Sequence, residues 1–92
     1  MIVHIGWEVC VPSRDVIAIL DKKSALSSPE TAQFIRLAKE QKRFTPCAEG
    51  ERAYLLVQQP ENDTVQVIAS AISPATLQKR FMSDGLNELV NA

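Results

Sequence analysis

Two largely apolar runs, at positions 53–58 and 64–69, are separated by a short polar segment at 60–63 that begins with proline. Valine, isoleucine and tyrosine favour extended backbone, and the Pro-Glu-Asn-Asp segment is typical of a turn. Strands joined by so few residues pair antiparallel, because a parallel pair needs a crossover of a dozen residues or more. We therefore predict a β-hairpin here, and the rest of the fold must be built around it.

Shorter strand signals occupy the N-terminal part of the chain. Val3 and Ile5, and then Val9 and Val11, alternate with polar or small residues on either side of a Gly-Trp pair, which predicts two short strands joined by a tight turn. Residues 16–20 form a continuous apolar run that is short enough for a strand buried on both faces. The polar residues that follow are expected to end this strand.

Two Ser-Pro pairs, at 28–29 and 73–74, predict the starts of two helices. Serine can cap free N–H groups, and proline fits the first helical position, where its missing N–H costs nothing. Apolar residues at helical spacing extend the first helix to about residue 43, before a Thr-Pro pair. The second helix is expected to run from 75 to about 82.

The Asp84-Gly85 pair is a stop signal for this second helix. Residues 83–92 form an amphipathic tail that is too short to be a stable helix alone, so it frays or docks on a partner. Residues 1–82 are expected to form one domain. The predicted fold class is α+β, with a small, mostly antiparallel β-sheet and two helices.

Charge and cysteine content suit a reduced cytoplasmic protein. The 92 residues carry a net charge of −1, so bulk electrostatics does not favour nucleic acid, although residues 22–43 alone carry +4. No apolar run approaches the ~18–20 residues that cross a bilayer, and the N-terminus does not resemble a secretory signal. The two cysteines, Cys10 and Cys47, are expected to be free thiols.

The sequence offers little for catalysis. His4 is the single histidine and lies among apolar strand residues, where a structural role is more common than a general base. The three glycines are too far apart for a phosphate-binding loop, and no CxxC or HxxxH pair is present. We predict no enzyme activity, no catalytic residue, no metal, no cofactor and no small-molecule substrate.

Binding residues are easier to nominate. Arg14 and Arg52 each lie beside a turn at the end of a predicted strand, where a guanidinium can reach phosphate; the alternative is two solvated turn residues. Trp7, at the tip of the first predicted hairpin, either covers a sheet edge or contacts a second copy. Leu86 and Leu89 of the tail are further candidates for such an oligomer interface.

Several segments together resemble a known bacterial family, the extracellular matrix regulators RemA and RemB. The opening residues 2–9 (IVHIGWEV), Gly50 before the hairpin and, above all, residues 70–80 (SAISPATLQKR) are similar to that family. Residues 11–28 (VPSRDVIAILDKKSALSS) are closer to the RemB branch. The resemblance covers about residues 1–80.

The resemblance implies control of matrix (biofilm) genes, a fold partly like the LytTR-type DNA-binding domain, and a ring-shaped homo-oligomer that binds duplex DNA through arginines. Arg14 and Arg52, with Lys22 and Lys23, are the implied phosphate contacts. Where RemA-like sequences have basic residues, this chain has Asp15, Glu51 and Tyr54. Two hypotheses follow: a ring that binds DNA, and a ring that acts through protein contacts without binding DNA.

Overall fold

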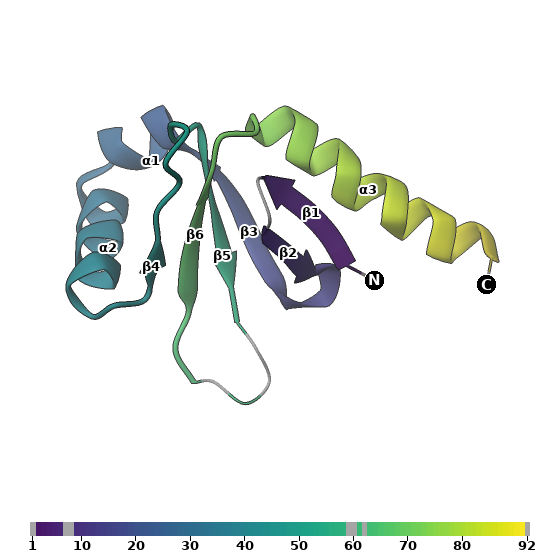
Figure 1. The fold of residues 1–92 in the computed structure, drawn as a ribbon, viewed down its shortest axis with the longest axis horizontal. Coiled ribbons are helices and arrows are strands. Elements are labelled where there is room, and N and C mark those ends of the chain that lie inside the picture. Colours follow the sequence, from purple (N-terminus) through teal and green to yellow (C-terminus); the bar gives the residue numbers. More distant parts are fainter. Residues whose placement is uncertain (1, 7–8, 59–60, 62, 92) are drawn as a thin grey trace.

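A computed structural model describes residues 2–6, 9–58, 61 and 63–91, with side chains described as far as Met82 (Figure 1). The chain folds into an α+β arrangement of two small sheets and three α-helices, which confirms the predicted class. In chain order the elements are β1 (Ile2–Gly6), β2 (Val9–Pro12), a 3-10 turn (Ser13–Asp15), β3 (Val16–Asp21), α1 (Lys22–Ser27), α2 (Pro29–Glu40), β4 (Phe44–Thr45), β5 (Ala53–Val57), β6 (Gln66–Ser70) and α3 (Pro74–Asn91).

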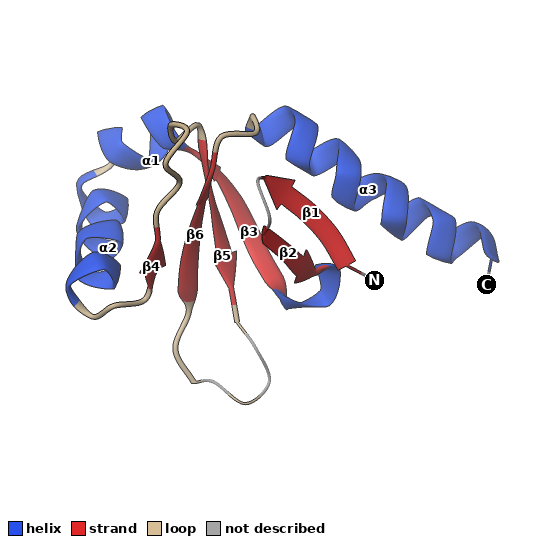
Figure 2. Cartoon of the chain, in the orientation of Figure 1, coloured by secondary structure: helices blue, strands red, loops and turns tan. Residues whose placement is uncertain are grey.

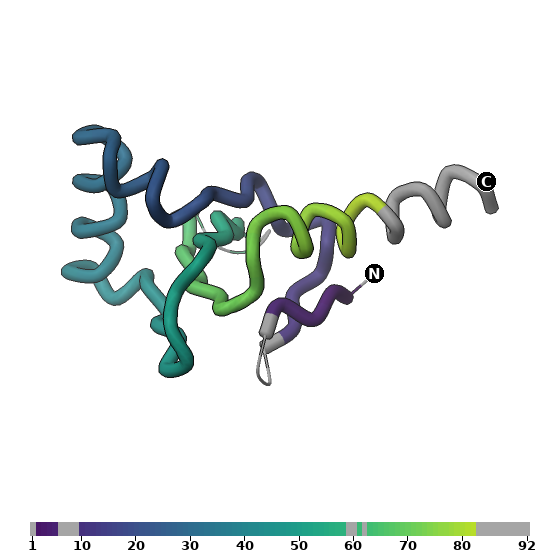
Figure 3. The backbone as a smooth tube through the Cα atoms, turned by 90° about the horizontal axis from the view of Figure 1, so that it is seen from above, coloured from purple at the N-terminus to yellow at the C-terminus, as the bar shows by residue number. Residues whose placement is uncertain are grey.

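The larger sheet has the strand order β3-β5-β6-β4. β5 pairs antiparallel with both β3 and β6, so the hairpin predicted at residues 53–69 is confirmed. The short strand β4 pairs parallel with β6, and β1 pairs with β2 in a separate two-stranded sheet. Helices α1 and α2 lie on one side of the larger sheet, and the β1–β2 hairpin with α3 lies on the other (Figures 2 and 3).

The central strand β5 divides the interior into two cores. Because alternate side chains of a strand point to opposite faces, Ala53, Leu55 and Val57 pack against the β1–β2 hairpin and α3, while Tyr54 packs against α1 and α2. All four side chains are buried, with at most 3 % of their surface exposed. The first core also contains Val3, Ile5, Val11 and Leu77, and the second contains Ala25, Ile35, Ala38, Val67 and Ala69.

Strand β3 corrects one sequence prediction, because it is not buried on both faces. A register irregularity between Val16 and Ala18 interrupts its pairing with β5. The intervening residue, Ile17, is 57 % exposed, while Val16 and Ile19 both pack against the first core. An extra residue at a bulge shifts the alternation of side chains by one position, and this places Val16 and Ile19 on the same face.

The residues expected to end β3 instead begin a helix, α1, which the sequence analysis did not predict. Asp21 supplies the cap, since its Oδ2 accepts a hydrogen bond from the Ser24 N–H at 3.0 Å. Helix α2 starts at Pro29 as predicted, but Ser28 makes no side-chain cap and its hydroxyl donates to Glu30 at 3.3 Å.

Helix α2 ends at Glu40, three residues before the predicted end, because a Schellman motif closes it. The Arg43 N–H donates to the Ala38 carbonyl at 2.7 Å and the Lys42 N–H donates to the Lys39 carbonyl at 3.3 Å. This closure needs a left-handed residue, and Lys42 takes that position with a φ of 59°. A residue with a Cβ is strained there relative to glycine.

Helix α3 also differs from its predicted end. The Ser73 hydroxyl caps it as expected, accepting a hydrogen bond from the Thr76 N–H at 3.3 Å. The helix continues through Asp84 and Gly85 to Asn91, so residues 83–91 of the predicted tail are the second half of α3. Glycine costs only about 1 kcal/mol inside a helix, which the other residues of α3 offset. No helix among the described residues is long and apolar enough to cross a membrane.

Side-chain hydrogen bonds attach the β1–β2 hairpin to the rest of the molecule. The buried Ser70 hydroxyl, at the end of β6, donates to the Ile5 carbonyl and accepts from the Ile72 N–H at 3.0 Å. On α3, Arg80 donates from Nη1 to the His4 carbonyl at 2.7 Å. These contacts join β1 to the end of β6 and to α3, and the candidate functional residues lie near the end of β6.

We expect Lys42→Gly to raise the free energy of unfolding by about 0.5–1 kcal/mol, because glycine adopts the left-handed conformation without a Cβ clash. Urea denaturation measures the change. Lys42→Ala is the matched control: it removes the same charge but keeps the Cβ, so it should not stabilise the protein. Equal stabilisation by both variants would show that charge, and not backbone strain, is the cause.

Candidate functional site

Three of the four nominated phosphate-binding residues lie around one surface depression. Lys22 and Lys23 begin α1, and Arg52 immediately precedes β5. They line an open hollow of about 950 Å³, which we call the basic hollow. Its full lining is Asp21, Lys22, Lys23, Leu26, Glu51, Arg52, Ser73, Pro74 and Ala75. The start of α3 therefore contributes as well as α1, β3 and the segment before β5.

The backbone explains why residues 30 positions apart meet here. Asp21 pairs with Ala53 at the end of the β3–β5 ladder, so the residue that follows β3 and the residue that precedes β5 are neighbours. The Lys22 N–H donates to the Arg52 carbonyl at 3.1 Å, and the Arg52 N–H donates to the Ser70 carbonyl at 2.8 Å. Arg52 is thereby fixed from both sides.

The chain enters this position through a turn that glycine makes possible. Gly50 has a φ of +107°, a backbone conformation that residues other than glycine rarely adopt. Its N–H donates to the Cys47 carbonyl at 3.3 Å, which closes the turn before Glu51 and Arg52. A substitution at Gly50 would be strained even though the surrounding space is open.

The two carboxylates of the basic hollow are both engaged within the chain. Asp21 accepts the hydrogen bond that caps α1. Glu51 accepts a hydrogen bond from the Tyr54 hydroxyl at 3.3 Å. Burial raises the pKa of Tyr54 above its ordinary value of 10.0, and the charge of Glu51 and this hydrogen bond raise it further.

The cations of the basic hollow are not tied up in the same way. Within the described part of the chain, the one ion pair is between Arg14 and Asp15. Lys22 is half-buried, whereas Lys23 and Arg52 are exposed, and none of the three takes part in that pair. With three basic and two acidic side chains, the lining carries a net charge of +1. The hollow therefore presents cations that remain available to an anion.

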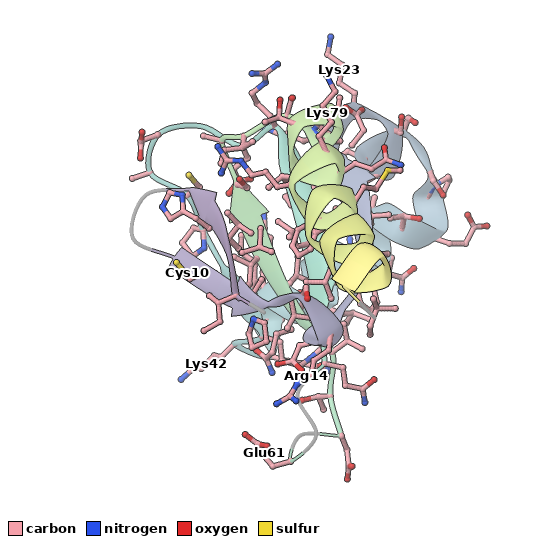
Figure 4. All side chains as sticks on the ribbon, turned by 90° about the vertical axis from the view of Figure 1, so that its right-hand side faces the viewer. Cys10, Arg14, Lys23, Lys42, Glu61 and Lys79 are labelled. Carbon is pink, nitrogen blue, oxygen red and sulfur yellow. The ribbon has the colours of Figure 1, made fainter. Side chains whose placement is uncertain are left out.

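Arg14, the fourth nominated residue, lies elsewhere. The Gln58 N–H donates to the Asp15 carbonyl at 2.9 Å, which places Arg14 and Asp15 beside the far end of β5. The six residue-to-residue steps from Arg52 to Gln58 span roughly 20 Å of extended chain. Figure 4 shows Lys23 and Lys79 at one end of the molecule and Arg14 at the other. Arg14 is 82 % exposed, and its Nε is 3.9 Å from Asp15 Oδ1.

The nominated interface side chains lie outside what the structure describes, and neither cysteine lines the basic hollow. Trp7 lies outside the described residues, and so do the side chains of Leu86 and Leu89, whose backbone belongs to α3. Cys10 is an exposed free thiol that lies opposite His4 in the β1–β2 ladder, and Cys47 is a half-buried one. Among the described residues, no group of three or more His, Cys, Asp and Glu side chains could hold a metal ion.

Sequence reasoning missed Leu26, Ser73, Pro74 and Ala75 as part of the same surface. The Ser73-Pro74 pair was identified as a helix start, but its distance from Lys22 in sequence gives no sign of proximity. The available signal was the pairing of the strands, since β3 and β6 end at this edge of the sheet and β5 begins there. Recognising α1 would also have brought Leu26 into consideration.

We expect Glu51→Gln to lower the pKa of Tyr54 toward 10.0 without reaching it, because burial, the largest cause of the shift, remains. Tyr54 is the single tyrosine of the chain, so an alkaline titration of tyrosinate absorbance reports on it directly.

The raised pKa of Tyr54 also means that the free energy of unfolding should fall as the pH rises past 10.0, since tyrosine in the unfolded chain ionises first. Glu49→Gln, at an exposed neighbouring position, is the control and should leave the titration unchanged.

Comparison with known protein families gives a match over nearly the whole chain. Residues 2–81 match the family described as RemA-like, extracellular matrix regulatory protein A-like. The match includes β1 to β6 and the first half of α3, and thus every residue of the basic hollow. A comparison with curated proteins finds no match. The chain belongs to the RemA-like family of extracellular matrix regulatory proteins.

Proposed function

We propose that this protein is a cytoplasmic, RemB-like regulator of extracellular matrix genes that binds duplex DNA as a ring-shaped homo-oligomer. Lys22, Lys23 and Arg52 contact the phosphates. The observation that carries the proposal is their meeting in the basic hollow. Membership of the matrix regulatory family supports the biological role.

The proposed contact is to the DNA backbone and not to base edges. The three cations lie at the start of a short helix and at the start of a strand, and not along a helix face that could enter the major groove. A lining charge of +1 gives weak attraction for a single subunit. Binding of useful strength then needs many copies acting on one duplex, as in a ring.

The two acidic residues at family basic positions differ in their effect on this surface. Asp15 is buried, 7 % exposed, and lies at the end of β5 remote from the basic hollow. Glu51 is half-buried and lines the hollow itself. Of the two, Glu51 is therefore the one that weakens attraction for phosphate at this site.

Glu51 also favours a second candidate function, a ring-forming module that acts through protein contacts and does not bind DNA. A carboxylate beside Arg52 lowers the local positive potential, and phosphate affinity depends on that potential. In this alternative the family architecture is kept while the DNA-binding activity is lost. Titration with DNA separates the two candidates.

We expect Arg52→Ala to weaken duplex binding for all sequences alike, and Glu51→Arg to strengthen it more than Arg52→Ala weakens it. Glu51→Arg raises the lining charge from +1 to +3, because it removes a repelling charge and adds an attracting one. Gel-shift titrations at low and high salt measure this, and each phosphate contact should change the slope of log K against log salt by about 0.9.

Arg14→Ala is the matched control, because it removes an exposed arginine at the opposite end of the molecule. It should change the titration far less than Arg52→Ala. If the unmodified protein shows no salt-sensitive binding and Glu51→Arg creates none, DNA binding through the basic hollow is wrong and the protein-contact candidate stands.

We also expect a homo-oligomer, with Trp7, Leu86 and Leu89 at the interface. The free edge of β3 supports this, since it exposes Ile17 beside a second hollow of about 440 Å³ that Phe81 of α3 also lines. Light scattering at tens of micromolar should give a mass several times that of the 10.2 kDa chain. A particle of monomer mass would contradict the prediction. Trp7→Ala should weaken assembly while leaving the far-UV circular dichroism of the subunit intact.

A further inference from the structure

We propose that the basic hollow binds a nucleoside monophosphate as a small-molecule ligand. Its phosphate contacts Lys22, Lys23 and Arg52, and its base packs against an apolar wall formed by Leu26, Pro74 and Ala75. This goes beyond DNA binding and does not depend on it. The ligand is bound without reaction, in keeping with the absence of a recognisable catalytic group in the sequence.

The shape of the site favours a small molecule. A ligand-binding hollow typically has a volume of roughly 300–1,000 Å³, and this one, at about 950 Å³, is large enough for a nucleotide. Contact with a DNA backbone needs only surface cations and not a depression of this size. Three separate segments of the chain contribute to the lining, so the hollow is a product of the tertiary fold.

The apolar wall is the feature that DNA binding leaves unexplained. Leu26 is 45 % exposed on α1, directly after the turn that carries both lysines. Pro74 and Ala75 add further apolar surface from the start of α3. An exposed leucine beside three cations matches a ligand that joins an anionic group to a flat apolar one. A nucleoside phosphate combines these two groups.

The polar side of the site is suited to a phosphate ester. The cations are free of the one ion pair found among the described residues, and both carboxylates have partners in the chain. In the first turn of α3, Pro74 has no N–H, while Thr76 and Leu77 donate to Ser73. Ala75 of the same turn lines the hollow, so the phosphate contacts of this proposal are the three basic side chains.

Hydrogen bonds hold the backbone that carries these groups, which limits the entropic cost of binding. The Arg52 backbone is held by Lys22 and Ser70, and Asp21 caps the helix that carries both lysines. A preorganised site needs less ordering when the ligand arrives, so more of the contact energy appears as affinity. Because the ligand uses the same cations as DNA, the two are expected to compete.

Isothermal titration calorimetry with AMP, adenosine and inorganic phosphate tests the proposal. AMP should bind at least about tenfold more tightly than phosphate or adenosine alone, because only AMP reaches both sides of the hollow. Leu26→Ser should weaken AMP binding about three- to tenfold and leave phosphate binding unchanged. Arg52→Ala should weaken both, and Arg14→Ala, the charge-matched control, should weaken neither. Circular dichroism checks that each variant is folded.

Two results would overturn the proposal: AMP binding no tighter than phosphate, or equal weakening by Arg14→Ala and Arg52→Ala, which indicates nonspecific charge attraction. A gel shift on the same samples keeps this test apart from the DNA proposal. AMP binding without DNA binding supports the ligand site and contradicts the DNA function. DNA binding without AMP binding does the reverse.

Discussion

The burial of β5 on both faces is the constraint on which the rest of the molecule depends. A strand covered on both sides must satisfy its backbone through two neighbouring strands and supply apolar side chains to two cores, and β5 does both. Its register fixes which residues end the sheet. Arg52 lies one step beyond β5, so the pairing that buries Ala53 also places the arginine beside Lys22.

The two ends of the same strand carry different sets of charged residues. At its start lie Arg52 and the basic hollow, and at its end lie Arg14 and the buried Asp15. An acidic side chain consequently has a different effect on the surface charge at each end. The Asp15 side chain is withdrawn from solvent, whereas Glu51 lines the basic hollow itself. A count of charges along the sequence gives the two carboxylates equal weight, whereas the fold places only Glu51 at the basic hollow.

Local signals in the sequence were enough for the elements that local chemistry determines. The β5–β6 hairpin and the helix starts at Pro29 and Pro74 followed from turn and capping residues. Long-range packing decided the rest. The bulge at Ile17 depends on the match between β3 and β5, and α1 depends on a cap by Asp21 in a segment that reads as the end of a strand. Strand β4 exists only because β6 is beside it.

The candidate site shows the same division. Lys22, Lys23 and Arg52 could be nominated one by one, because a cation beside a strand end is visible in the sequence. Their convergence could not, since it depends on the β3–β5 register, and neither could the separation of Arg14 from them. The apolar wall was hidden for a related reason: Leu26 gains its role only when α1 brings it to the start of α3.

A surface with three cations and one apolar wall has a consequence for regulation. Two anions that need the same cations cannot occupy one subunit together. A bound small molecule would therefore lower the affinity for DNA by the same factor by which bound DNA lowers the affinity for the small molecule. In the proposed assembly of identical subunits, DNA binding would be the product of many weak phosphate contacts. Removing even a fraction of those contacts then lowers the affinity of the whole assembly steeply. If both proposals hold, a weak ligand that is abundant in the cell would be sufficient to control DNA binding through this hollow, provided that it reached several subunits at once.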